Sequence, residues 1–230
     1  MFEFNKVRIN PIVDNFRRIK GNTLSILINK SGEVTVKAPY NLRVSDINAF
    51  INKKMDWINK KKIVFETNKL VPKNYSEGEK FLYLGDWYEL KIVPGAKNGI
   101  EFDRENFILR NDVLPNAKDA FSKLYKILAY NYITFKTIEL SNKYGFQFGK
   151  IKFNYTKTKW GSCTAKKTLI FNSKLIMAPV DVVDYVIIHE LCHTKHMNHS
   201  KEFWSLVAEI CPDYKNKIKW LKLNGHTLEF

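Results

Sequence analysis

The segment 184–204 reads DYVIIHELCHTKHMNHSKEFW and decides how the rest of the chain is organised. It contains the pattern H-E-x-x-H at His189, Glu190 and His193. Two histidines four residues apart lie on one face of a helix, so both imidazoles can reach one cation. A third histidine, His199, follows six residues after the second. Three protein ligands with one open position are typical of catalytic zinc sites, whereas structural zinc sites are closed.

The residues around the motif predict a helix, a break and a second helix. The apolar run 185–188 leads into the motif, as expected for a buried helix that carries a site. Pro179 and Asp181 suit the start of this helix, because acidic side chains stabilise the N-terminal end of the helix dipole. Ser200 is a good N-cap for a second helix that begins directly after it. His199 should then lie at the start of the second helix, folded back toward the first two histidines.

The chain resembles the YgjP-like metallopeptidases, which are relatives of the SprT-like proteases within the zincin group. Four pieces of sequence carry this likeness: the Trp-Gly-Ser-Cys box at 160–163, the lead-in 185–186, the core 189–193, and the tail 198–204. The resemblance implies a zinc-dependent peptidase with His189, His193 and His199 as metal ligands. It also implies that Glu190 is the catalytic carboxylate. Lys159 stands before the box where many family members carry arginine.

Other third ligands remain open. His196 lies three residues beyond His193 and projects to a neighbouring helical face, so His199 has the better spacing. Glu202 and Glu209 compete with it, because related zinc peptidases take a glutamate from a following helix. The alternative is a helix without a metal site, whose histidines are surface or core residues. The residues around the motif disfavour this alternative.

The expected chemistry is hydrolysis of a peptide bond by a metal-activated water, with Glu190 as general base. Ser162 and Cys163 are interpreted as residues that shape the box rather than as nucleophiles, because a nucleophile needs a base and the histidines are better used on metal. Cys192 lies within the motif but on another helix face, and we expect it to be packed. The pair of strands around the box predicts an open sheet edge for an extended peptide.

Composition sets broad limits on the class of protein. The chain has 230 residues, of which 45% are hydrophobic and 14% aromatic, enough for a sizeable core. Apolar runs are too short to span a bilayer, and residues 1–6 lack the apolar region of a secretory signal. Three cysteines do not make a disulfide framework. We therefore expect a cytoplasmic protein without a membrane partner.

The formal net charge of +15 comes almost entirely from lysine. Base contacts favour arginine, so the lysines are interpreted mainly as solvated faces. The charge still supports nonspecific attraction to nucleic acid. The alternative function is a DNA-associated SprT-like protease, or a basic nucleic-acid-binding module with a structural metal site. The sequence disfavours a zinc deaminase, because H-x-E with P-C-x-x-C is missing from it.

The predicted fold class is α+β, with two domains. Residues 1–112 should form a β-rich module with one helix, and residues 113–230 a zincin-like metallopeptidase domain with a small sheet beside the motif helix. Apolar alternation and turn residues predict an edge strand at 7–13, a hairpin at 22–38 and strands at 81–84, 87–93, 100–102, 106–109, 150–155 and 168–172. Helical periodicity predicts helices at 45–62 and 116–145, and a last helix around 214–221.

Overall fold

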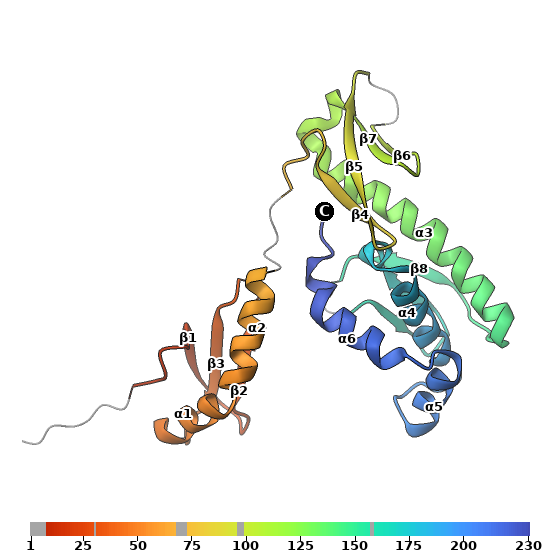
Figure 1. Cartoon of the computed structure of the whole chain (residues 1–230). Helices are drawn as coiled ribbons and strands as arrows, with labels where there is room; N and C mark the ends of the chain where they lie inside the picture. The colour runs from red at the N-terminus through yellow and green to blue at the C-terminus, as the bar shows by residue number, and fades with distance from the viewer. Residues whose placement is uncertain (1–7, 30, 68–72, 96–98, 157–158) are drawn as a thin grey trace, which may run out of the picture. The chain divides into compact units, whose positions relative to one another are not determined.

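The computed structural model describes residues 8–29, 31–67, 73–95, 99–156 and 159–230. It divides into two compact units, Met1–Val71 and Pro72–Phe230, which we call unit 1 and unit 2 (Figure 1). Six α-helices and three small sheets in the described residues confirm the predicted α+β class. No helix in these ranges is long and apolar enough to cross a membrane.

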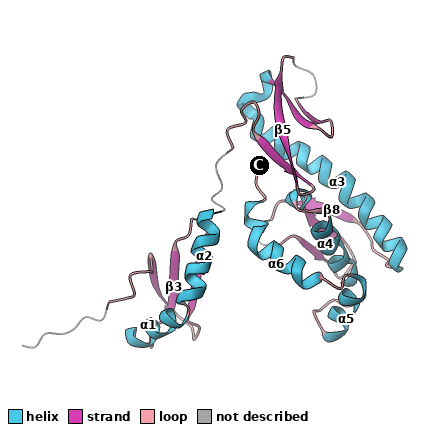
Figure 2. Ribbon diagram, in the orientation of Figure 1, coloured by secondary structure: helices cyan, strands magenta, loops and turns pink. Residues whose placement is uncertain are grey.

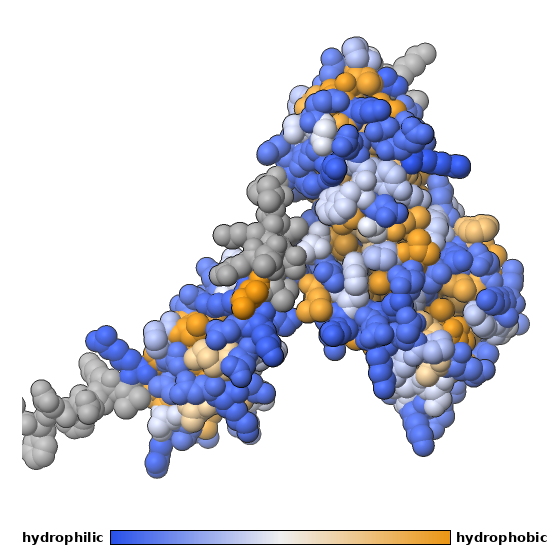
Figure 3. Space-filling model, viewed as in Figure 1, coloured by the Kyte–Doolittle hydropathy of each residue, from blue (hydrophilic) through white to orange (hydrophobic). Residues whose placement is uncertain are grey.

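Unit 1 is a three-stranded sheet packed against two helices (Figure 2). Its strands are β1 (Asn15–Ile19), β2 (Ser25–Ile28) and β3 (Val34–Pro39), in the order β1-β3-β2. β2 and β3 are antiparallel, which confirms the predicted hairpin, and β1 runs parallel to β3. The helices are α1 (Val44–Lys53) and α2 (Met55–Thr67). The core consists of alternate β3 residues and apolar helix residues: Val34, Val36, Ala38, Ile47, Ile51 and Ile58. Hydrophilic residues cover most of the visible face of this unit (Figure 3).

Two predictions for unit 1 were wrong. The described part of the expected strand at 7–13 forms a turn, because Val13 N–H donates to the Asn10 carbonyl at 3.0 Å and Pro11 favours turn geometry. Val7 lies outside the described residues. The single helix expected at 45–62 is broken at Lys54, whose φ of −102° and ψ of 5° depart from helical values.

Unit 2 begins with a four-stranded sheet that packs on a long helix. The strands are β4 (Lys80–Tyr83), β5 (Asp86–Val93), β6 (Ile100–Phe102) and β7 (Asn106–Arg110), in the order β4-β5-β7-β6. A short 3₁₀ turn, η1 (Asn111–Asn116), leads into α3 (Ala117–Tyr144). Gly145 ends this helix at φ 64°, as its position in the sequence predicts. These strands and α3 agree with the predicted elements within two residues at each end.

The site is built by a second sheet and three helices. The strands are β8 (Ile151–Asn154), β9 (Gly161–Cys163) and β10 (Leu169–Asn172), in the order β8-β10-β9. The turn η2 (Ser173–Met177) leads into α4 (Val180–Cys192), which is followed by α5 (Lys201–Ile210), α6 (Tyr214–Asn224) and η3 (Gly225–Thr227). Figure 1 shows α4 lying beside this sheet. The last three residues of the Trp-Gly-Ser-Cys box form edge strand β9, which pairs with β10.

One hydrophobic core joins both sheets of unit 2, because it includes Phe81 and Phe107 of the first sheet and Leu169 and Phe171 of the second. The ring of Phe121 on α3 lies 4.1 Å from that of Phe81 and 5.6 Å from that of Phe107, between centroids. The Tyr125 hydroxyl donates to the Leu82 carbonyl at 2.6 Å. The predicted domain boundary at residue 112 does not coincide with the division of the structure, because it would separate these strands from the helix that buries them. The compact unit containing the site begins at Pro72 instead.

Candidate active site

Three histidine side chains converge at the end of α4. His189 lies on the last turn of α4, His193 follows the helix as its C-cap, and His199 precedes the N-cap of α5. One ring nitrogen of each lies within 4.8 Å of the others, and the Nε2 atoms of His189 and His199 are 3.1 Å apart. The turn between α4 and α5 therefore folds the third histidine back onto the first two. Ser200 caps α5 as predicted, accepting from the Phe203 N–H at 3.4 Å.

The outward nitrogens of two rings have partners that orient them. The Nδ1 of His193 lies 3.0 Å from the His196 carbonyl oxygen. Because a carbonyl only accepts, this Nδ1 carries the proton and the lone pair of Nε2 is free. The Nδ1 of His189 lies 3.4 Å from the Tyr185 hydroxyl, one helical turn earlier. Such outer partners are typical of metal-binding histidines.

Two aromatic rings of α5 stack on the imidazoles of His193 and His199. Phe203 stacks on His193 with centroids 4.4 Å apart, and Trp204 stacks on His199 at 5.4 Å with an interplanar angle of 19°. Trp204 also stacks on Tyr214 of α6, with centroids 5.2 Å apart. The rings therefore fix the orientation of His199, which is itself exposed.

Burial keeps the imidazoles of His189 and His193 neutral. Burial, together with the neighbouring His193 and His199, lowers the pKa of His189 to about 3. Burial also lowers the pKa of His193, although its hydrogen bond to His196 opposes the shift. Neutral imidazole is the form that binds a metal ion. His189 and His193 are therefore suited to bind a cation at physiological pH.

Glu190 lies next to this cluster, under strand β9. Its side chain is 4% exposed, and its Oε2 atom has no hydrogen-bond partner among the described residues. Burial raises the pKa of Glu190 to about 8, and the nearby Lys159 ammonium opposes this shift. Gly161 of β9 leaves room for the carboxylate: a Cβ there would lie 2.6 Å from Oε1 and 2.7 Å from Cγ of Glu190. The glycine of the box thus permits the close approach of strand and helix.

Strand β9 presents an unpaired edge to the site. Asn172 N–H donates to the Trp160 carbonyl at 2.9 Å, and Thr164 N–H donates to the Thr168 carbonyl at 3.0 Å. Because hydrogen-bonded pairs alternate along an antiparallel ladder, the backbone groups of Gly161 and Cys163 point away from β10. These groups are available to an additional strand.

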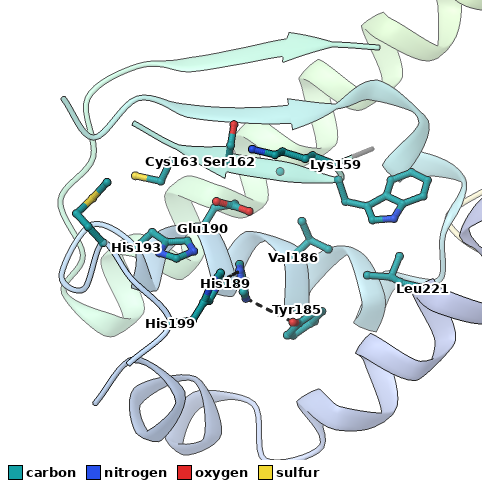
Figure 4. A pocket seen from close by; sticks show the side chains of 13 residues that line it. Lys159, Ser162, Cys163, Tyr185, Val186, His189, Glu190, His193, His199 and Leu221 are labelled. Carbon is teal, nitrogen blue, oxygen red and sulfur yellow. Dashed lines mark hydrogen bonds between the residues drawn. The ribbon is translucent and has the colours of Figure 1, made fainter. Parts of the chain in front are cut away.

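A cleft of ≈ 430 Å³ is lined by the three histidines, Glu190 and β9 (Figure 4). Its walls come from β9, from α4 with the turn after it, and from α6, and its lining comprises Lys159, Trp160, Gly161, Ser162, Cys163, Tyr185, Val186, His189, Glu190, His193, Met197, His199 and Leu221. Burial, assisted by Glu190, raises the pKa of the Cys163 thiol to about 11. The thiol is therefore neutral at physiological pH and is a weak nucleophile.

The sequence matches the model of a protein family described as "YgjP-like, metallopeptidase domain" over residues 22–224. The chain belongs to the YgjP-like family. Membership of this metallopeptidase family implies a metal ion, and the three-histidine cluster is consistent with a metal site. The crystal structure of the metallopeptidase zymogen of Pyrococcus abyssi abylysin matches with 21% identity and a TM-score of 0.35, covering 40% of this chain and 94% of its own. No curated protein matches the chain.

The geometry separates the candidate ligands of this YgjP-like chain. Among the described residues, the group of potential metal ligands consists of His189, His193 and His199. His196 contributes its backbone carbonyl rather than its ring to the cluster. Glu202 and Glu209 are exposed on α5 and lie outside the group. Cys192 is fully buried and packed, as expected.

Sequence reasoning missed several residues of the YgjP-like site. Tyr185 was part of the lead-in, although its spacing of four residues from His189 places both on one helix face. Phe203 and Trp204 entered only as the end of the tail 198–204, whereas their rings contact the histidines. The sequence carries no signal for the contact between Gly161 and Glu190, because it joins elements far apart along the chain.

Proposed function

We propose that this protein is a zinc-dependent metallopeptidase that hydrolyses peptide bonds of peptide or protein substrates, with Glu190 as general base. The observation that carries the proposal is the convergence of three imidazoles within 4.8 Å beside a buried carboxyl group. Membership of a metallopeptidase family supports the same activity.

The donor set fits zinc. Nitrogen donors in tetrahedral geometry suit Zn²⁺, with Zn–N lengths of about 2.0–2.1 Å, which separate neighbouring ligand nitrogens by roughly 3.3 Å. The 3.1 Å between the Nε2 atoms of His189 and His199 is close to that spacing. His189, His193 and His199 would hold the ion. When bound, zinc supplies Lewis-acid activation of water and of the scissile carbonyl.

Glu190 supplies the proton transfers in this proposal. Its carboxylate accepts a proton from the water that attacks the scissile carbonyl, and it then donates the proton to the leaving amine. A carboxyl whose pKa is raised toward neutral pH is suited to both steps, because it can gain and then lose a proton in that range. The Oε2 atom without a partner is available for this role.

Strand β9 supplies the means to hold an extended substrate. A peptide lying along its open edge would pair with the backbone groups of Gly161 and Cys163, adding a strand to the sheet order β8-β10-β9. The same edge lies above Glu190, since Gly161 contacts its carboxylate. The scissile bond is thereby positioned between the strand and the histidines.

The test is Glu190→Gln, compared with Glu202→Gln as a matched control on an exposed carboxyl of α5. We expect Glu190→Gln to bind zinc with parental stoichiometry and to lose hydrolysis of an unstructured test protein. Glu202→Gln should keep both properties. Hydrolysis by Glu190→Gln at the parental rate would refute the role of Glu190. Stoichiometric zinc with no hydrolysis of any peptide by the parent protein would favour a metal-stabilised scaffold instead.

A further inference from the structure

The cleft extends past the histidines into a region without catalytic groups. Trp160, Val186 and Leu221 line this region, which we call the apolar hollow. Figure 4 shows Val186 and Leu221 together on one side of His189, with His193 on the other side. The hollow has no role in the chemistry proposed above, yet it opens into the same space.

Each wall of the hollow is held by a different element. Val186 lies three residues before His189 on α4, so both side chains occupy one helix face. Leu221 belongs to α6, and Trp160 directly precedes β9. The Trp160 indole rests against Gly225, where a Cβ would lie 2.8 Å from its Cζ2 atom. Two walls of the hollow therefore belong to helices, and the third packs against Gly225.

The apolar hollow lies beside the place that the scissile bond would occupy. Trp160 adjoins Gly161, which contacts Glu190, and Val186 is one turn from His189. In a peptide paired with β9, alternate side chains point to opposite faces of the added strand. A side chain that points toward α4 beside the scissile bond enters the space between Val186 and Leu221.

The residues that line the apolar hollow determine which substrate side chain can bind there. An indole and two aliphatic groups offer no acceptor for an ammonium group, so a lysine side chain would lose its hydration uncompensated. We propose that the apolar hollow binds a large aliphatic or aromatic side chain of the substrate residue that adjoins the scissile bond. Leu221 is then a specificity-determining residue. This inference rests on the proposed peptidase activity.

Leu221 is the best place to test the hollow, because it is half-buried and lies on a helix that carries neither histidine nor Glu190. Leu221→Glu puts a carboxylate into the hollow, and Leu221→Ala enlarges it. Ile218→Glu is the matched control: it is also half-buried on α6 but lies outside the lining of the cleft. The zinc content of each variant is measured alongside its activity.

The experiment first maps the cleavage sites of the zinc-loaded parent protein in an unstructured test protein by mass spectrometry. Peptides are then compared that differ in one residue beside the scissile bond, with leucine, phenylalanine, alanine or lysine there. We expect the parent protein to prefer leucine to lysine in kcat/KM by at least tenfold, since a single methylene in an apolar pocket is worth roughly 10–200-fold. Leu221→Glu should reduce this ratio at least tenfold, and Leu221→Ala should shift preference toward phenylalanine.

Ile218→Glu should leave the leucine-to-lysine ratio unchanged even if total activity falls. Parental ratios in both Leu221 variants would overturn the role of the hollow while leaving the peptidase activity intact. Cleavage without any preference for apolar residues beside the bond would do the same. Absence of cleavage by the zinc-loaded parent protein would instead overturn the proposed function, and the inference with it.

Discussion

Replacing Gly161 by alanine tests how closely β9 and Glu190 are packed. The new Cβ would lie 2.6 Å from Oε1 and 2.7 Å from Cγ of Glu190, whereas ordinary contacts are 3.4–4 Å. The carboxylate or the strand must therefore move by most of an ångström. Overpacking of this kind costs about 1–3 kcal/mol of folding free energy. A displacement of about 1 Å in a catalytic group lowers the rate by roughly 100-fold.

The matched control is Gly145→Ala at the end of α3. A Cβ there meets nothing within 4 Å, but φ is 64°, so the substitution costs roughly 1–2 kcal/mol without touching the cleft. Both variants should lower Tm, and both should bind zinc with parental stoichiometry. Peptide hydrolysis per folded molecule should fall roughly 100-fold in Gly161→Ala alone. Parental kcat/KM in Gly161→Ala would refute the reasoning.

Three further changes have defined outcomes. His199→Ala removes a ligand and should weaken zinc binding, measured by chelator competition, by more than the roughly 10–100-fold typical of losing a hydrogen-bond partner of a ligand. His196→Ala keeps the backbone carbonyl that binds His193 and should leave zinc affinity unchanged. Chelation of zinc should lower Tm, because zinc at 1,000 times Kd stabilises the fold by about 4.1 kcal/mol. Burial raises the pKa of Asp184 despite the nearby Lys136. The free energy of unfolding of the parent protein should therefore decrease as pH rises from the pKa of Asp184 in the unfolded chain to its higher pKa in the folded protein. Asp184→Asn should raise Tm near neutral pH and abolish this decrease.

Periodicity and capping residues predicted most of the elements around the site. The apolar repeat along 116–145 and the glycine after it gave the bounds of α3 nearly to the residue. Ser200 was recognisable as an N-cap, since its hydroxyl is suited to accept an amide of the next helix. These features depend on residues close together in the chain, which is why they can be inferred without coordinates.

Features that depend on distant pairing were not predictable. The three residues Gly161–Cys163 have no strand pattern of their own and become a strand by pairing with β10. The partner of His193 is the backbone carbonyl of His196, which the residue type does not encode. The nucleic-acid contact suggested by charge stays a prediction, because net charge measures attraction and not a binding site.

The junction between the first sheet of unit 2 and α4 limits how the protein can be shortened. The Leu84 N–H donates to the Ile176 carbonyl at 2.8 Å, and a Cβ on Gly85 would lie 2.8 Å from the Cα of Pro179. A minimal fragment that starts after β7 would lack the strands that cover the aromatic side chains of α3. It would also lack the contact between Gly85 and Pro179, the residue before α4. A shortened chain for crystallography or directed evolution should keep the β4–β5 hairpin, because the turn of this hairpin packs against the start of the helix that carries His189.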